Sequence, residues 1–207
     1  MRIDHVVLGS RSLDASAERL LRDHGLASLP GGRHPGWGTG NRIIPLGHDY
    51  VELLAVVDPA AASRSAFGRF MTELTADGDR WFTLCIGDDD LEGTADRLGL
   101  EVVTGSRERL DGTIVRWSSA GLEDPKREPW MPFFIRWEVP PDRHPGAAPL
   151  EHRVPVTGIS WVEMGGDVSR VRDWLGGEDL PIRPIDGDPG VRAVALSTAD
   201  GSEIVLI

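Results

Sequence analysis

The sequence predicts an α+β protein made of two to three repeated βαβββ modules, whose curved mixed sheets surround a cleft with the helices on the outer face. Apolar strand-like runs are each followed by a glycine, one helix-like segment and further strand-like runs. This order returns at a spacing of roughly 75 residues. Because a single helix covers only one face of such a sheet, two modules are expected to curl around a shared cleft.

The first module is expected over about residues 1–58. RIDHVVLG alternates like a strand, and Ser12 is placed to cap a helix over LDASAERLLRDH that Gly25 ends. NRIIPL and DYVELLAVV then have the composition of two strands joined by the turn GHD, with one further short strand expected in the same module.

The second module is expected over about residues 80–140, because RWFTLCIGDDDL overlays RIDHVVLGSRSL without gaps. A helix in LEGTADRLG and strands in LEVVT, TIVRWSSAG and PFFIRWEV follow. Residues 141–155 are predicted to be a linker, so that residues 1–140 form one domain. A third module over residues 156–207 has a short helix in DVSRVRDWLGG and ends with the strand SEIVLI.

The composition of the chain excludes some classes of binding partner. The formal net charge of −11 opposes binding to nucleic acid, and no apolar run approaches the roughly 20 residues that span a bilayer. The start of the chain lacks the features of a secretory signal, so a cytoplasmic protein is expected. Cys85 is the single cysteine and lies in an apolar run, where an inert buried thiol is the favoured interpretation.

The glycine-rich stretch RHPGWGTGN is not a dinucleotide loop. Such a loop follows a strand and opens a helix, whereas this one leads into the strand NRIIPL. Its glycines instead allow the backbone to approach a ligand or another segment closely. His34, Trp37 and Asn41 are therefore expected to bind substrate at the rim of the cleft, or else to serve only the structure of the crossing.

The modules resemble the vicinal oxygen chelate superfamily, with IDHVVLGSRSLDASAERL opening the first module and YVELLAV closing it. HPGWGTGNRIIPLGHDYVELLAV, PWMPFFIRWE and HPGAAPLEH resemble its glyoxalase-like branch, and the resemblance covers nearly the whole chain. It implies the fold shared by glyoxalases, bleomycin resistance proteins and dioxygenases. It also implies a divalent metal bound by the first and last strands of paired modules.

These strand positions correspond to His5 and Glu52, which the resemblance assigns as ligands of zinc, nickel, manganese or iron. Histidine and glutamate suit such metals, and a glutamate in an apolar strand needs a metal, proton or partner to offset its burial. The second module places Thr83 opposite His5 and residues 134–136 opposite Glu52, so the ligand set is incomplete.

Several side chains remain candidates to complete the site. Glu203 of the third module stands opposite Glu52 and is expected to act as a third ligand or as general base. His34, His144 and His152 are further candidates. Arg136 is expected either to bind a substrate carboxylate or to pair with Glu52.

Two functions follow. One is a divalent-metal-dependent lyase, isomerase or oxygenase that acts on a small vicinal-oxygen substrate. The other is a metal-free protein that binds or sequesters a small molecule. Because three modules are an odd number, the third is expected to pair with the first or to be paired in a homodimer.

Overall fold

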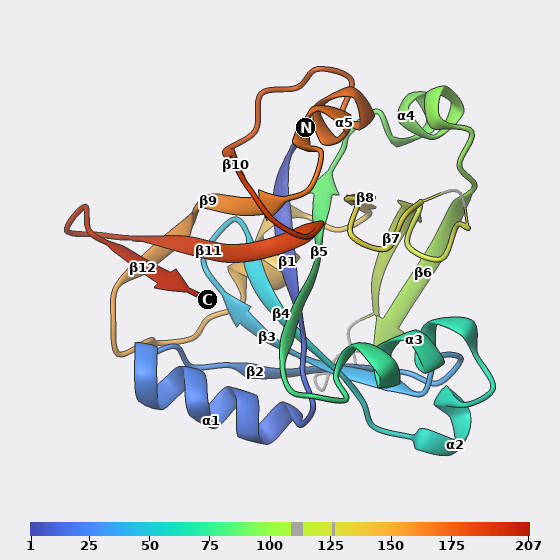
Figure 1. Ribbon diagram of the computed structural model, residues 1–207. Coiled ribbons are helices and arrows are strands. Elements are labelled where there is room, and N and C mark those ends of the chain that lie inside the picture. Colours follow the sequence, from blue (N-terminus) through green and yellow to red (C-terminus); the bar gives the residue numbers. More distant parts are fainter. Residues whose placement is uncertain (109–113, 126) are drawn as a thin grey trace.

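Two β-sheets organise the chain (Figure 1). The computed structural model describes residues 1–108, 114–125 and 127–207. Its larger sheet has eight strands in the order β2-β3-β4-β1-β5-β8-β7-β6, and its smaller sheet has four in the order β10-β9-β11-β12. The predicted α+β class is confirmed.

The first half of the larger sheet follows the predicted βαβββ order. Ser12 caps α1 by accepting a hydrogen bond from the Ala15 backbone N–H, and Gly25 ends the helix with a φ of 72°. The last strand returns parallel to the first, which places Glu52 opposite Val7. The elements are β1 (Arg2–Gly9), α1 (Leu13–His24), β2 (Leu29–His34), β3 (Thr39–Pro45) and β4 (Tyr50–Val56).

The second half repeats this topology, with its first and last strands again parallel. Two helices that the sequence analysis did not predict, α2 (Pro59–Ala62) and α3 (Ala66–Leu74), connect the halves. The repeated elements are β5 (Arg80–Gly87), α4 (Leu91–Leu98), β6 (Val102–Glu108), β7 (Ile114–Ala120) and β8 (Phe133–Trp137).

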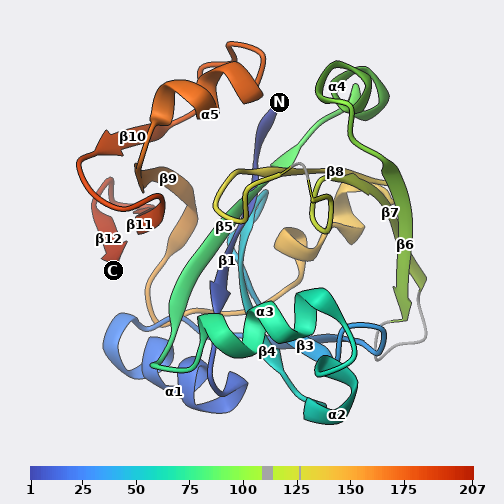
Figure 2. The ribbon, with the colours of Figure 1, turned by 45° about the vertical axis from the view of Figure 1, so that its right-hand side comes forward.

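The two halves meet where β1 pairs antiparallel with β5, so that His5 lies opposite Cys85. From this join the sheet curls until its edge strands β2 and β6 approach each other (Figure 2). Phe67 and Met71 of α3 pack on the concave side together with Val7 and Phe82. Helices α1 and α4 pack on the opposite, convex side, where their buried residues join the main core.

The third unit has the predicted element order but a different pairing. Here the first strand lies between the second, to which it is parallel, and the third, to which it is antiparallel. Val162 and Leu196 of this sheet share a core with Val6 and Leu84, so the third unit covers the convex face. Its elements are β9 (Val156–Gly165), α5 (Val168–Trp174), β10 (Ile182–Ile185), β11 (Gly190–Thr198) and β12 (Glu203–Leu206).

The segment predicted to be a linker, residues 141–155, lies against the first half of the larger sheet. It contains the 3-10 helices η1 (Pro141–Arg143) and η2 (Pro145–Ala147). The Gly47 N–H donates to the Gly146 carbonyl over 2.9 Å, and the Arg153 N–H donates to the Gly25 carbonyl over 2.8 Å. These bonds fasten the segment to the turn after β3 and to the end of α1.

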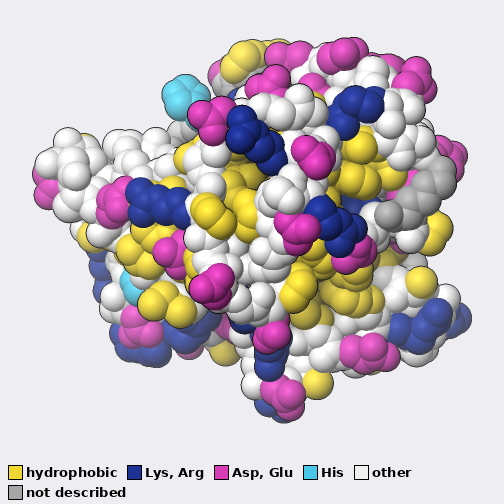
Figure 3. Space-filling model, turned by 45° about the horizontal axis from the view of Figure 1, so that its top comes forward, with side chains coloured by type: hydrophobic (Ala, Val, Ile, Leu, Met, Phe, Trp, Pro, Cys, Tyr) yellow, Lys and Arg dark blue, Asp and Glu magenta, His cyan; other side chains and the backbone are white. Residues whose placement is uncertain are grey.

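The surface carries charges of both signs. On the face drawn in Figure 3, Arg side chains lie among Asp and Glu, with hydrophobic side chains exposed between them. None of the helices in the described residues is both long and apolar enough to span a membrane.

Gly38 holds the glycine-rich hairpin against α2. Its φ is +70°, and an added Cβ would lie 2.3 Å from the Ala62 nitrogen and 2.5 Å from the Asp58 oxygen. Gly38→Ala is therefore expected to lower the free energy of unfolding by about 2–4 kcal/mol, measured by urea denaturation. Gly36→Ala in the same hairpin is the matched control, because no described atom lies within 4 Å of its Cβ position. Equal losses for the two variants would contradict the steric argument.

Asp49 links the turn before β4 to the second sheet by accepting the Ile159 N–H over 3.0 Å. Burial raises its pKa to about 6 against that hydrogen bond, and the charge of Asp4 adds to the rise. Because the folded state holds this proton more tightly than the unfolded state, stability falls as pH rises from about 4 to about 6. Asp49→Asn keeps the acceptor and removes the charge. It should raise the free energy of unfolding at pH 8 by about 1–2 kcal/mol, with no gain at pH 4.

Urea titrations at both pH values measure this difference. Asp89→Asn, at a side chain that is 95% exposed, serves as the control and should change stability equally little at either pH. A gain for Asp49→Asn that is the same at pH 4 and pH 8 would refute the charge explanation.

Candidate functional site

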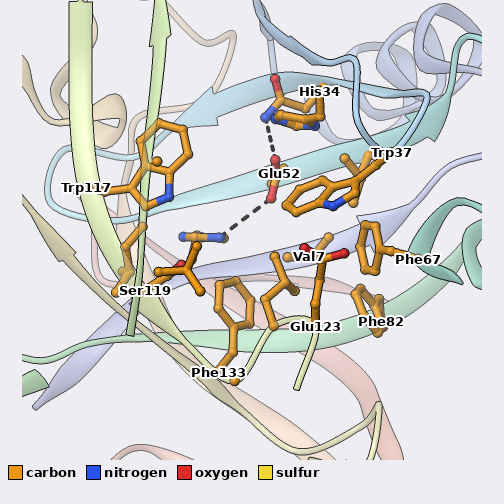
Figure 4. A pocket seen from close by; sticks show the side chains of 18 of the residues that line it. Val7, His34, Trp37, Glu52, Phe67, Phe82, Trp117, Ser119, Glu123 and Phe133 are labelled. Atoms are coloured by element: carbon orange, nitrogen blue, oxygen red, sulfur yellow. Dashed lines mark hydrogen bonds and ion pairs between the residues drawn. The ribbon is translucent and has the colours of Figure 1, made fainter. Parts of the chain in front are cut away.

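A pocket of about 490 Å³ opens on the concave face of the larger sheet (Figure 4). Its lining comes from both halves of that sheet and from the connecting helix α3. Aromatic side chains and carboxylates share its walls, with Trp37 and Trp117 on opposite sides of Glu52. The carboxylates are Glu52, Glu101, Glu123 and Asp124. The aromatic lining residues are Trp37, Tyr50, Phe67, Phe82, Trp117, Phe133 and Trp137.

Glu52 projects into this pocket from β4, and its side chain is only 12% exposed. Asn41 on the neighbouring strand β3 donates its amide N–H to Glu52 Oε1. The Asn41 side-chain oxygen accepts the Gly32 backbone N–H over 2.6 Å. The amide is thus held at both ends, and it orients one carboxylate oxygen while the other faces His5.

His5 reaches the pocket from β1, next to β4. Its Nε2 lies 3.6 Å from Glu52 Oε2, and its Nδ1 lies 2.8 Å from Asp4 Oδ1. The imidazole stacks on Tyr50, with ring centroids 4.3 Å apart, and the edge of Phe133 contacts it from another direction. Contacts with both rings and both carboxylates leave the imidazole little freedom to turn.

The neighbouring side chains of Asp4 and His5 meet because β1 is irregular at this point. Ile3 of β1 pairs with Ile86 of β5, and the next pair is His5 with Cys85, so two steps along β1 correspond to one step along β5. Such a bulge leaves Asp4 as the extra residue and redirects side chains relative to the regular alternation of a strand. The sequence analysis missed Asp4 because regular alternation places adjacent residues on opposite faces.

Asp4 is fully buried and accepts hydrogen bonds from three side chains. Besides His5, they come from His144 Nε2 at 3.0 Å and from Trp137 Nε1 at 3.1 and 3.2 Å. Burial by itself would raise the pKa of Asp4, but the hydrogen bonds from His144 and His5, together with their charges, hold it far below its usual value. The buried carboxyl group is therefore ionised.

The chemistry of His5 Nε2 and Glu52 Oε2 fits a divalent metal ion. Nitrogen and oxygen ligands at about 2.1 Å from a tetrahedral zinc ion lie about 3.4 Å apart, close to the 3.6 Å between His5 Nε2 and Glu52 Oε2. A histidine ligand commonly donates its other N–H to a carboxylate, which is how His5 is bonded to Asp4.

A second buried group could also hold a metal, since Asp4, His5 and Cys85 place ligand atoms within 4.8 Å of one another. There, however, Asp4 and His5 Nδ1 already bond to each other, and burial raises the pKa of the Cys85 thiol well above its ordinary value. The pair formed by His5 Nε2 and Glu52 has the better ligand chemistry.

The sequence profile of the glyoxalase-like domain family matches residues 3–176. This chain belongs to that family. The match confirms the resemblance to glyoxalase-like proteins that the strand and loop motifs indicated.

Solved structures resemble this glyoxalase-like protein in fold. A hypothetical protein from Staphylococcus aureus is 19% identical with a TM-score of 0.73, covering 97% of this chain and 92% of its own. Methylmalonyl-CoA epimerase from Mycobacterium tuberculosis is 18% identical with a TM-score of 0.46, covering 67% of this chain and 89% of its own. A variant of the Streptomyces coelicolor epimerase, in complex with 2-nitronate-propionyl-CoA, is 17% identical with a TM-score of 0.48, covering 67% of this chain and 96% of its own. A comparison with curated proteins gave no match.

Two more predicted residues of the glyoxalase-like domain lie in the pocket beside Asn41. His34 Nδ1 lies 3.0 Å from the Thr39 hydroxyl, and its ring contacts Trp37 with centroids 5.3 Å apart. Trp37 in turn packs against Phe67 of α3. The glycine-rich hairpin therefore contributes part of the pocket wall.

Two other predicted residues lie elsewhere. Arg136 pairs with Glu92 of α4, at 2.7 Å from Nη2 to Oε1, rather than with Glu52. Glu203 lies on β12 of the second sheet and accepts a hydrogen bond from Trp161 Nε1 at 2.9 Å. Neither lines the pocket in the part of the chain that the structure describes.

Arg127 shapes the opposite wall, and the sequence analysis missed it because its surroundings are polar. It is buried and donates to the carbonyls of Gly121 at 2.6 Å and Leu122 at 3.0 Å, as well as to those of Pro129 and Met131. Burial lowers its pKa to about 10, so the guanidinium stays charged at neutral pH. Gly121 and Leu122 line the pocket.

Arg127→Leu should remove the guanidinium from these four carbonyls, of which Met131 keeps the Thr83 hydroxyl and Gly121 keeps the Asp124 N–H. The free energy of unfolding should fall by about 2–4 kcal/mol, measured by urea denaturation. Arg170→Leu, at a surface arginine paired with Glu128, is the control and should change stability by less than about 1 kcal/mol. A small loss for Arg127→Leu would mean that water replaces the guanidinium.

Proposed function

We propose that this protein is an enzyme that binds a small organic substrate in the concave pocket, where His5 and Glu52 hold a divalent metal ion. The main support is the short distance of 3.6 Å between His5 Nε2 and Glu52 Oε2, which lie on the adjacent parallel strands β1 and β4. Each side chain is oriented by a second polar residue, Asp4 for His5 and Asn41 for Glu52.

The small number of protein ligands indicates the kind of substrate. Two side chains hold a metal weakly and leave several coordination positions open. A substrate with two neighbouring oxygen atoms would fill two of those positions. When bound, zinc, nickel, manganese or ferrous iron would supply Lewis acidity that stabilises an oxyanion or an enolate. The reaction class is that of a lyase, an isomerase or an oxygenase.

Other residues orient the two proposed ligands and bind the apolar part of the substrate. Asp4 and Asn41 keep the imidazole and the carboxylate in place before substrate arrives, which lowers the cost of organising them during the reaction. The aromatic walls made by Trp37, Trp117 and Phe133 exclude water and bind the apolar part of the substrate. Glu203 has no part in this scheme, because it lies on the second sheet.

A second candidate function is metal-free binding or sequestration of a small molecule. The aromatic side chains of the lining favour it, because they can hold the apolar part of an organic ligand without reacting with it. The two functions differ in whether His5 and Glu52 bind a metal.

Calorimetric titration of the protein, first treated with a chelator, with zinc, nickel and manganese should show about one ion bound per chain. Glu52→Gln should weaken binding at least tenfold because it removes a charged ligand. Asn41→Ala should weaken it about tenfold because it removes the partner that orients Glu52. Both variants keep the buried Asp4–His5 pair, so the fold should be retained, as checked by circular dichroism.

The matched control is Glu92→Gln, which removes a carboxylate bonded to Arg136 outside the pocket and should leave binding unchanged. Equal weakening by Glu52→Gln and Glu92→Gln would indicate nonspecific attraction to an acidic protein. Wild-type protein that binds none of these ions, nor ferrous iron under anaerobic conditions, would refute the metal enzyme and favour the binding protein.

A further inference from the structure

His144, from the segment predicted to be a linker, is bonded to a backbone group in a way that fixes the position of its proton. The Gly146 backbone N–H donates to His144 Nδ1 over 3.0 Å. A backbone N–H can only donate, so the neutral imidazole has its lone pair on Nδ1 and its proton on Nε2. Nε2 lies 3.0 Å from Asp4 Oδ2 and therefore donates to it.

A second obligatory donor acts on the same carboxylate. The indole N–H of Trp137 can only donate, and it lies 3.2 Å from Asp4 Oδ1 and 3.1 Å from Oδ2. An ionised carboxylate can only accept, so Asp4 also accepts from its remaining partner, His5 Nδ1 at 2.8 Å. The N–H groups of His144 and Trp137 thus hold the carboxylate in the orientation in which Oδ1 faces His5 Nδ1.

We propose that His144 is a positioning residue, which holds the Asp4 carboxylate turned toward His5 so that neutral His5 keeps its proton on Nδ1 and presents the Nε2 lone pair to the pocket. The imidazole nitrogen that carries the proton is set by the bond at the other nitrogen. The lone pair then faces Glu52 Oε2, at a distance of 3.6 Å. That this lone pair binds a metal rests on the proposed function, whereas the position of the proton does not.

The same segment contains a second histidine, His152, which attaches the segment to the first half of the sheet without being bonded to Asp4. His152 Nδ1 accepts the Ala27 backbone N–H over 3.0 Å, and its Nε2 lies 2.7 Å from the Pro45 carbonyl oxygen. Its bonding therefore parallels that of His144, but it ends on a backbone carbonyl instead of a carboxylate. Both histidines fasten the segment, and only His144 is bonded to Asp4.

The test is a long-range ¹⁵N–¹H correlation spectrum of metal-free protein with ¹⁵N-labelled histidine, recorded at about pH 9, well above the ordinary range of imidazole titration. In wild type, His5 should show a protonated Nδ1 and an unprotonated Nε2, and His144 the reverse. His144→Phe, which lacks the donor, should give His5 a mixture of the two forms. His144→Gln restores a donor and should restore the wild-type pattern, and His152→Gln should leave His5 unchanged.

A wild-type spectrum with the His5 proton on Nε2 would overturn the proposal even if no variant folds. So would a His144→Phe variant whose His5 pattern equals that of wild type. If the proposed function also holds, His144→Phe should weaken metal binding about tenfold and His144→Gln should recover most of it. A wild type that binds no metal but shows the expected His5 pattern would refute the proposed function and leave the role of His144 standing.

Discussion

A carboxylate with no exposed surface, that of Asp4, constrains the whole concave site. Burying an ion without donors is costly, so the fold must bring hydrogen-bond donors to both of its oxygens. They arrive from β1, from β8 and from the segment after β8, as His5, Trp137 and His144. The first strand, the last strand of the second half and the segment 141–155 are therefore tied together at one point.

These hydrogen bonds to Asp4 depend on the curvature of the larger sheet. The two halves join edge to edge at β1 and β5, and the bulge at Asp4 lies in that join. The aromatic side chains on the concave face line a pocket in which Glu52 Oε2 and His5 Nε2 lie 3.6 Å apart. The third unit stabilises the arrangement from the convex side, where its sheet shares a core with β1 and β5. A fold of this kind supports several chemistries, so the choice among them depends on the pocket.

Part of the site followed from residue patterns. His5 and Glu52 occupy the strand positions that the resemblance assigned to metal ligands, and His34, Trp37 and Asn41 occur in a loop of unusual composition. Glu203 and Arg136 were also predicted, from the register of the last strands in the second and third units. That reasoning could not show that the sheet of the third unit packs on the convex side, nor that Glu92 of α4 lies within reach of Arg136.

The sequence by itself determined the order of strands and helices within each repeated unit, the caps of α1 and the α+β class, but not the connecting helices α2 and α3. These features depend on side-chain periodicity and on residues close together along the chain. Only the tertiary structure decided which sheet forms the pocket and which residues complete it. Asp4 meets His5 through a bulge, and His144 meets Asp4 from 140 positions along the chain. Arg127 is buried by the loop that it organises. Contacts between distant segments leave no periodic signal in the sequence, so the pattern of residues cannot reveal them.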